Sequence, residues 1–338
     1  MSLGAALLVA SSAHAQVFKI TPGTPGAVLS TEAALEAFLS ELEDEVNAGL
    51  PSVETGEYTK GMANASAMAT SGTAVVYGTP FSFGLIGANL SAGIDLGEGN
   101  KLSDFDAEKA AGFGAQAGII LGFNPGSIMS SPIGFIDPTR MQLFLSYFAQ
   151  KRTLDTADVD FASFGVTAKY RLFDARNLAT SLVKWNGLDV LGGIRYNKMK
   201  GSFTKEFDTE FTGTGGVTAT VAGPAVIGAD VKVISIPVEA STSLRLAYFL
   251  NLIGGAALDF NFGSSTANGD YDSDIDFTDG STATGDLELG GKASPTLLNA
   301  RAFIGTGIDF AVGSLNFTLG KSLTASAWNV NTMLSLYW

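Results

Sequence analysis

The chain of 338 residues contains no cysteine and a single histidine, His14. Without cysteine it can form no disulfide, no thiolate metal site and no lipid anchor on a mature N-terminal cysteine. Histidine is a common general base or orienting group in hydrolases. Because His14 lies in a segment that export would remove, we expect a protein that is not an enzyme and needs no cofactor.

Charged side chains are also scarce, at 16% of residues against about 25% in a typical soluble domain. The chain is 46% hydrophobic and holds 41 glycines. It has no run of about eighteen apolar residues, so no transmembrane helix is expected. A transmembrane β-barrel fits this composition, because its lipid-facing apolar residues alternate with polar residues that face the lumen. The net charge of −13 argues against a nucleic-acid partner.

The N-terminus indicates export. Leu3 to Val9 is a short apolar run, and Ala13-His14-Ala15 has the small-x-small form of a signal-peptidase site. We therefore expect residues 1–15 to be a removed signal peptide, although no basic residue precedes the apolar run. The alternative is a buried N-terminal helix.

Residues 16–78 are predicted to form a periplasmic lead-in before a barrel over residues 79–338. A helix is expected at about 31–48, because apolar residues recur there along one helical face. These residues, which are candidate oligomer contacts, are Leu35, Phe38, Leu39, Leu42 and Val46. The helix either packs on its own barrel or in the lumen, or it joins neighbouring subunits. Residues 61–76 fit either a second helix or a weak first strand.

The rest of the chain alternates apolar and polar residues with period two, which indicates β-strands with two unlike surroundings. Gly254-Gly255 is predicted to be a hairpin turn. Counting all candidates gives twelve strands, with ten as the second choice. The candidate strands are 82–96, 111–123, 141–150, 161–172, 188–196, 202–212, 225–239, 244–252, 256–262, 298–310, 314–322 and 328–338. The predicted fold class is an all-β, antiparallel up-and-down transmembrane barrel.

The final segment is the most informative. Its apolar parity contains Trp328, Val330, Leu334, Leu336 and Trp338. It resembles the closing strand of the outer-membrane β-barrel proteins of Gram-negative bacteria, of porin-like type. That resemblance implies location in the outer membrane, contact with outer-membrane lipid, and recognition of this strand by the barrel-insertion machinery. The alternative is the last strand of a soluble β-sandwich.

Every charge in the clearest strands falls on the non-apolar parity, since Arg or Lys on the lipid face costs roughly 2–4 kcal/mol near the midplane. These inward charges either line an open, water-filled lumen or pair with one another and close it. If the lumen is open, the excess of bases favours anions. The candidate lumen residues are Asp95, Gln116, Lys169, Arg171, Asp189, Arg195, Arg245, Asp259, Arg301 and Asp309.

Two long connections, 124–138 and 264–294, are expected to face outward, because outer loops are usually the longer ones. The second contains alternating carboxylates at Asp270, Asp272, Asp274 and Asp276. Calcium binds such oxygen-rich loops. However, the residue six positions along is Ile275, where an EF-hand loop needs glycine, so a solvated acidic loop is the main interpretation and calcium the alternative.

Three functions remain open at this point. The first is a homo-oligomeric porin-like barrel that passes small polar solutes. The second is a structural protein whose ring of barrels encloses lipid, because the acidic helix before the barrel resembles that of the oligomeric porin-like proteins of predatory bacteria. The third is a surface receptor or adhesin that uses outer loops.

Overall fold

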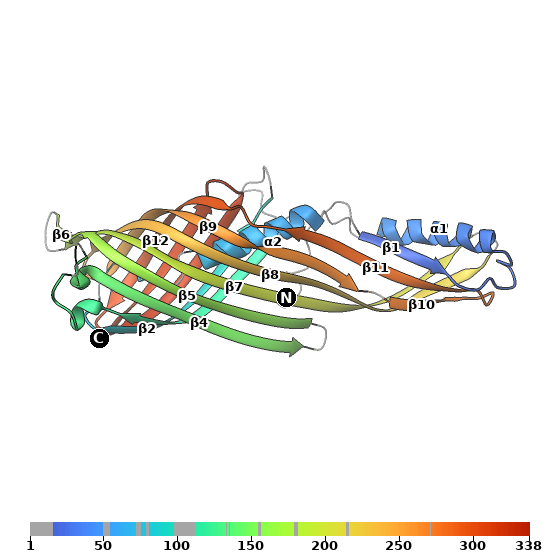
Figure 1. The fold of residues 1–338 in the computed structure, drawn as a ribbon, viewed down its shortest axis with the longest axis horizontal. Coiled ribbons are helices and arrows are strands. Elements are labelled where there is room, and N and C mark those ends of the chain that lie inside the picture. Colours follow the sequence, from blue (N-terminus) through green and yellow to red (C-terminus); the bar gives the residue numbers. More distant parts are fainter. Residues whose placement is uncertain are drawn as a thin grey trace.

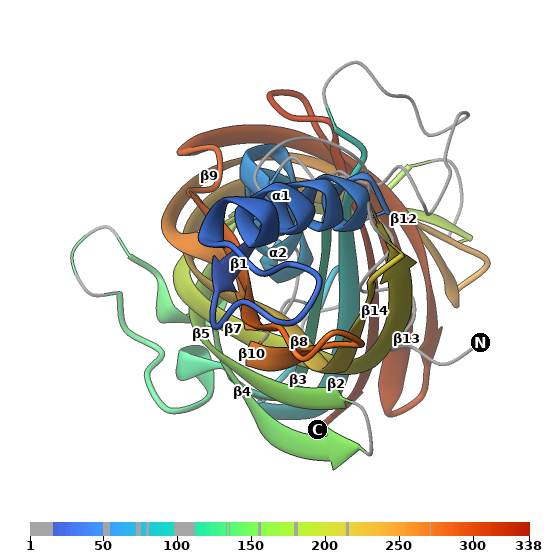
Figure 2. The ribbon, with the colours of Figure 1, turned by 90° about the vertical axis from the view of Figure 1, so that its right-hand side faces the viewer.

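A computed structural model describes residues 16–49, 55–71, 76–78, 81–97, 112–132, 134, 136–154, 157–178, 182–213, 216–270 and 272–338. The predicted signal peptide, with His14, lies outside these residues. Ten antiparallel strands form a closed ring, which is sealed where β14 (Ala327–Tyr337) pairs with β2 (Gly84–Asp95) and where β7 (Val183–Thr212) pairs with β8 (Thr218–Leu246) (Figures 1 and 2). An up-and-down β-barrel is therefore the fold, with the second of the two predicted strand numbers.

The ring consists of neighbours in chain order. Its strands are β2 (Gly84–Asp95), β3 (Gly112–Phe123), β4 (Met141–Leu154), β5 (Ala157–Phe173), β7 (Val183–Thr212), β8 (Thr218–Leu246), β9 (Leu250–Asp270), β12 (Leu298–Phe310), β13 (Gly313–Ser322) and β14 (Ala327–Tyr337). The other elements are β1 (Gln16–Pro22), α1 (Glu32–Gly49), α2 (Thr55–Thr70), β6 (Arg176–Asn177), β10 (Asp272–Phe277), β11 (Thr282–Ala293), and the short 3-10 turns η2 (Pro125–Ser127) and η3 (Pro138–Arg140).

The difference between twelve and ten strands comes from two very long strands. Candidates 188–196 and 202–212 are both parts of β7, which is 30 residues long, and β8 is 29 residues long. Both strands continue well beyond the distal edge of β5, whose first residue, Ala157, pairs with Phe203 of β7. Period two is a local signal, so it does not reveal that two segments belong to one continuous strand.

The predicted turn at Gly254-Gly255 is wrong. The chain turns instead at residues 247–249, where Ala247 and Tyr248 have positive φ angles of 50° and 70°. Gly254 and Gly255 lie within β9, and Gly255 pairs with Phe303 of β12. An added Cβ on Gly255 would collide with the Phe303 ring, so this glycine allows an inward aromatic side chain rather than a turn.

The outer surface of the ring is apolar all the way round. Large exposed apolar side chains occur on every strand of the ring, including Leu90, Ile119, Tyr147, Val166, Ile194, Val238, Leu258, Ile304, Phe317 and Leu334. The inward parity carries most of the buried polar residues, together with a few apolar clusters. The alternation of apolar and polar residues predicted from the sequence therefore separates the outer face of the barrel from its inner face.

Helix α2 lies inside the ring, where it contacts β2, β3, β7, β8, β9 and β14 (Figure 2). Residues 61–70 are all buried. The segment 61–76, which fitted either a helix or a strand, is helical as far as Thr70. Neither α2 nor any other helix in the described part of the chain is long and apolar enough to span a membrane.

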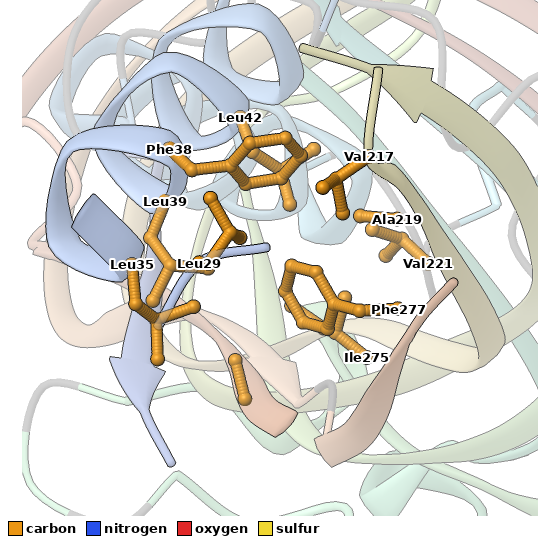
Figure 3. Packing of buried hydrophobic residues seen from close by; sticks show 11 residues of the cluster. Leu29, Leu35, Phe38, Leu39, Leu42, Val217, Ala219, Val221, Ile275 and Phe277 are labelled. Atoms are coloured by element: carbon orange, nitrogen blue, oxygen red, sulfur yellow. The ribbon is translucent and has the colours of Figure 1, made fainter. Parts of the chain in front are cut away.

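Beyond one end of the ring, the extensions of β7 and β8 continue a sheet with β10, β11 and β1, and α1 packs on it (Figure 1). We call this part the distal module, and the end of the ring that bears it the distal end. Its core contains Leu35, Phe38, Leu39 and Leu42 of α1 against Val217, Ala219, Val221, Ile275 and Phe277 (Figure 3). The helix predicted at 31–48 therefore buries its apolar face within its own chain.

The opposite, proximal end holds both ends of the barrel sequence, since Gly84 and Tyr337 lie in paired neighbouring strands. The connection 124–140 is also at this end, because Phe123 pairs with Gly84. The connection from β9 to β12 lies at the distal end and contains β10 and β11. The two long connections that were expected to share a side therefore lie at opposite ends.

Candidate functional site: the helix-filled interior

Helix α2 is held by close contact between backbones. Its central residues are small, with Ala63, Ala65, Ala67 and Ala69 all buried. The helix backbone at Ala65 and Ser66 lies against Gly93 of β2 and Gly114 of β3, which are paired across the two strands. An added Cβ on Gly93 would overlap the backbone of Ala65, and one on Gly114 would overlap that of Ser66. These two glycines form a groove that only a helix of small residues can enter.

Hydrogen bonds fix the second half of the helix. Just past its middle, the Asn64 amide donates to Asp95 of β2 at 2.8 Å and accepts from the backbone N–H of Thr296 at 2.8 Å. Farther along, Asn197 of β7 donates to the Ser66 hydroxyl at 2.9 Å. Strands on different sides of the ring thus bind the same helix, so it is a built part of the barrel.

The end of α2 is bound by buried ionic side chains. Arg195 donates from Nη1 to the carbonyl oxygen of Thr70 at 2.7 Å. A cation is favourable there, because the last carbonyls of a helix lack partners and carry the negative end of its dipole. Asp259 accepts from the Ser71 hydroxyl at 3.1 Å, and Asn329 donates to the Ser71 carbonyl oxygen at 3.0 Å.

Arg301 is the centre of the most buried ion cluster. Its Nη2 lies 2.6 Å from Glu239 and its Nε lies 2.8 Å from Asp259, and all three side chains are essentially inaccessible. Tyr77, just beyond α2, donates its hydroxyl to Glu239 at 2.9 Å. The segment after the helix is therefore tied into the same cluster.

A second cluster lies nearer the proximal end. Lys169 donates to the Val76 carbonyl oxygen at 2.8 Å and lies 3.5 Å from Asp189. Arg171 contacts the other oxygen of Asp189 at 3.0 Å and also reaches the Gly78 carbonyl oxygen at 3.4 Å. Inward charges that the sequence placed on one parity thus bind one another and the segment 76–78.

The remaining lumen candidates are spread along the interior. Gln116 is buried in β3. Arg245 and Asp309 are half-buried near the proximal turns. In the structure, most of the candidates bind α2, the segment after it, or an opposite charge. This arrangement corresponds to the interpretation in which the inward charges pair and close the lumen.

A polar cavity of about 330 Å³ lies at the proximal end. It is bounded by β4, β5, β7 and the two 3-10 turns of the 124–140 connection. Its lining side chains are Asn124, Asp137, Thr139, Arg140, Gln142, Lys169, Arg171, Asp174 and Asp189. Arg140 lies 2.6 Å from Asp174 across the mouth. The proximal connection thus borders this cavity beside the ends of β4 and β5.

Several interior residues were not predicted as site residues. Glu239 falls on the inward parity of β8, but Pro224 and Pro237 obscured that strand. Tyr77 and Asn64 belong to a segment with no clear periodicity. The composition of residues 61–70 is the one usable signal: a run of Ala, Ser, Gly and Met suits a helix that is surrounded on all sides.

Two other candidate groups can be located. Of the proposed oligomer contacts, Leu35, Phe38, Leu39 and Leu42 are buried in the distal module, while the side chain of Val46 lies outside the described ones. Of the acidic series, only the Asp276 side chain is described, and it is exposed on β10; those of Asp270, Asp272 and Asp274 lie outside. Among described side chains no cluster of three potential metal ligands occurs.

A closed antiparallel ring with an apolar outside, a polar inside and an internal helix defines the chain as a helix-filled β-barrel of the membrane type. The chain belongs to the Lsa36-like family, whose match extends over residues 12–338. No curated protein sequence matches it significantly.

Among solved structures, the chain is similar to the translocator domain of the autotransporter NalP from Neisseria meningitidis, with 11% identity, 90% of this chain and 95% of that chain covered, and a TM-score of 0.30. It is also similar to the toluene transporter TbuX from Ralstonia pickettii, with 11% identity, 82% and 98% coverage and a TM-score of 0.22. A third is LpxR from Salmonella typhimurium, with 12% identity, 75% and 100% coverage and a TM-score of 0.24.

Proposed function

We propose that this protein is an outer-membrane β-barrel that is closed by its own helix α2 and displays the distal module at the cell surface, as a receptor or adhesin does. The membrane assignment rests on the apolar outer surface. Soluble monomers rarely expose a contiguous apolar patch beyond a few hundred Å², whereas here apolar side chains surround the ring. The last strand, β14, supplies the aromatic end that insertion machinery would read.

Closure rests on the position of α2, which is the single observation that carries this proposal. Barrels of about eight strands are filled by their own side chains, while those of sixteen or more leave a channel. A ring of ten has room for one thin helix, and α2 occupies that room. Porin-like passage of small polar solutes would require α2 to leave its glycine groove and the bonds of Arg195 and Asp95.

The side on which the module lies follows from the connections. Outer-membrane barrels have short periplasmic turns and longer outer loops. The proximal end has the tight turns at residues 247–249 and 311–312 beside the longer 124–140 connection, and the distal end bears the much larger module. Because β1 pairs with β11, the lead-in and the 264–294 connection share one side. In this proposal residues 16–49 and that connection lie outside the cell, in place of the periplasmic lead-in predicted over residues 16–78.

Oligomerisation stays a prediction. The apolar face of α1 packs on its own chain, so a ring of subunits that encloses lipid would need another contact surface. Outward alanines such as Ala88, Ala92 and Ala302 offer a small-residue surface for it. The proposal gives the protein no catalytic role.

The absence of cysteine allows a direct test of the side assignment. Single substitutions Glu36→Cys, on the exposed face of α1, and Ile128→Cys, exposed at the proximal end, place one thiol on each side. A membrane-impermeant maleimide applied to intact cells should label Glu36→Cys alone, and both variants after lysis. Labelling of Ile128→Cys alone on intact cells would reverse the assignment.

Closure is tested separately in planar bilayers. The purified wild-type protein should show no steady ion conductance at moderate voltage, because α2 blocks the ring. A stable open conductance of the unmodified protein, at the level of an ungated pore, would instead support the porin-like function.

A further inference from the structure

The polar cavity at the proximal end is formed by the barrel wall as well as by the connection beside it. At about 330 Å³ it falls within the size range of small-molecule sites, which often lie in the mouths of β-barrels. Its buried floor comes from three neighbouring strands. Gln142 of β4 lies opposite Lys169 of β5, and Arg171 of β5 lies opposite Asp189 of β7. Paired strands therefore hold the side chains of the floor in place.

The floor carries one more positive than negative charge. Lys169 lies 3.5 Å from one oxygen of Asp189, and Arg171 lies 3.0 Å from the other. One carboxylate thus faces two cations, and these three side chains are at most 14% exposed. The described residues use only Nε and Nη2 of Arg171, so the floor still has a charged donor to offer.

The neighbouring charges do not supply the missing negative charge. Deeper in the barrel, Arg301 contacts both Glu239 and Asp259. The second negative charge of that cluster is offset by Arg195, so the cluster is neutral as a whole. Nearer the proximal turns, two cations outnumber one carboxylate; these residues are Lys184, Arg245 and Asp309. The excess of positive charge at the floor therefore remains.

Gln142 is the polar group of the floor that the protein leaves unsatisfied. Its side chain lines the cavity and is 4% exposed. Neither its Nε2 nor its Oε1 has a hydrogen-bond partner among the described residues. Leaving a buried amide without partners is costly, and such groups are usually paired. A polar ligand that both accepts and donates hydrogen bonds would satisfy it.

The mouth of the cavity has the opposite charge. Arg140 contacts two carboxylates there, Asp174 at 2.6 Å and Asp137 at 3.8 Å, so one negative charge is in excess. These side chains are 36% to 61% exposed, which shows that the cavity reaches water at this point. A molecule in the cavity thus meets positive charge at the floor and negative charge at the mouth.

We propose that this cavity binds a small zwitterion, a free polar amino acid. Its carboxylate accepts from Lys169 and Arg171 at the floor, its ammonium group lies toward Asp137 and Asp174, and Gln142 binds its polar side chain. Each end of the ligand meets the charge that it lacks. In the orientation proposed above the mouth opens to the periplasm, but binding depends neither on that orientation nor on the role of the distal module.

Isothermal titration calorimetry of the full-length protein in detergent tests the proposal. The ligands are L-serine, L-threonine, L-asparagine and L-glutamine, each at up to about 10 mM, which approaches saturation for a Kd of about 1 mM. At least one should bind saturably, one molecule per chain. Its N-acetyl derivative lacks the ammonium charge and its C-terminal amide lacks the carboxylate. Each should bind about tenfold or more weakly, because one charged contact is lost.

Two glutamine variants show whether the floor binds the ligand. Gln142→Leu should weaken binding about fivefold or more, because it removes hydrogen bonds to the ligand. It should leave the unfolding midpoint of the free protein unchanged or higher, since the amide that it removes has no protein partner. Gln116→Leu, on β3 outside the cavity lining, is the matched control and should bind the amino acid as the wild type does.

Two charge variants test the two ends separately. Lys169→Met should weaken binding of the amino acid about tenfold or more, while Asp189 keeps Arg171 as its partner. Asp137→Asn removes a carboxylate at the mouth. It should weaken binding of the free amino acid but leave binding of its N-acetyl derivative unchanged, because that derivative carries no ammonium charge.

Either of two results would overturn the proposal. If none of the four amino acids gives saturable heat, water alone fills the cavity. If the N-acetyl derivative binds as tightly as the free amino acid, the mouth plays no part and the ligand is not a zwitterion. Should Lys169→Met fail to fold, the derivatives and Gln142→Leu still decide. These results are independent of closure and orientation, which conductance and maleimide labelling measure.

Discussion

The two helices of this protein are each packed on a sheet, but different forces hold them. Helix α1 has one apolar face, and it buries Leu35, Phe38 and Leu42 in the distal module. Helix α2 is enclosed on all sides, has small residues, and touches a wall of polar groups and glycines. The first is held by apolar burial, which depends on area. The second is held by close backbone contact and by hydrogen bonds, which depend on shape.

This difference explains how the interior of a membrane barrel can be filled. The outside must be apolar, so the inward parity is left with polar residues, and a helix placed there must satisfy them. Asn64, Ser66 and the carbonyl oxygen of Thr70 do so, each with a partner on the wall. A helix as amphipathic as α1 would not satisfy these polar groups, which share the wall with apolar residues such as Met199, Val231 and Val233.

The largest effect is expected in the glycine groove, where the fit of α2 depends on the absence of a side chain. Gly114→Val adds a side chain where even a Cβ overlaps the backbone of Ser66, so α2 should be displaced and the barrel should conduct ions or fail to fold. Gly254→Val is the matched control, because nothing lies within 4 Å of an added Cβ there. Conductance in planar bilayers and heat stability in detergent measure both. Equal behaviour of the two variants would contradict the assigned role of the groove.

Loss of Arg301 should be nearly as severe. Arg301→Met leaves Glu239 and Asp259 buried without their cation, and breaking such a pair costs about 3–5 kcal/mol. Restoring neutrality with the triple variant Arg301→Met, Glu239→Gln and Asp259→Asn should recover much of this. The urea unfolding midpoint measures the loss, and a triple variant no better than the single one would show that charge is not the cause.

In the distal module the corresponding change should have a local effect. Phe38→Ala removes an aromatic ring that packs on Phe211 and Phe277, which costs about 3–5 kcal/mol in a core. Protease cleavage between residues 20 and 49 should accelerate, while the barrel keeps its unfolding midpoint. Glu36→Ala, on the exposed face, is the control. An equal fall in barrel stability would mean that the two regions unfold together.

The smallest effect concerns the loop before α1. Although partial burial opposes it, backbone N–H donation from Leu29, Ser281 and Val28 lowers the pKa of Asp279 to about 2. This carboxylate therefore stabilises the module fully above its unfolded pKa of about 3.9, and the contribution is lost as the pH falls through about 2.

Asp279→Asn should remove this dependence and cost about 0.5–2 kcal/mol at neutral pH, as a lost capping carboxylate does. Hydrogen exchange at the amide of Leu29, compared between wild type and variant from pH 1.5 to 5, measures it. Curves that run in parallel over this range would exclude Asp279 as the titrating group.

The sequence by itself determined the wall of the barrel. Alternation is a local property, because neighbouring side chains of a strand point to opposite faces, and so the candidate strands, the closing strand and the inward charges could be found without a structure. The helix at 31–48 was equally clear from its period. The residue pattern did not show that 188–196 and 202–212 form one strand. The length of a strand depends on its partner strands, and the local sequence does not record where those partners end.

Only the tertiary structure decided what the inward charges do. Arg195 and Thr70 are 125 residues apart, and Arg301 and Glu239 are 62 apart, so their pairing depends on closure of the whole ring. The same holds for β1, which reaches β11 from the other end of the chain and so places the module beyond the distal end. Periodicity assigns a residue to a face, but what occupies the enclosed space depends on segments that only the folded chain brings together.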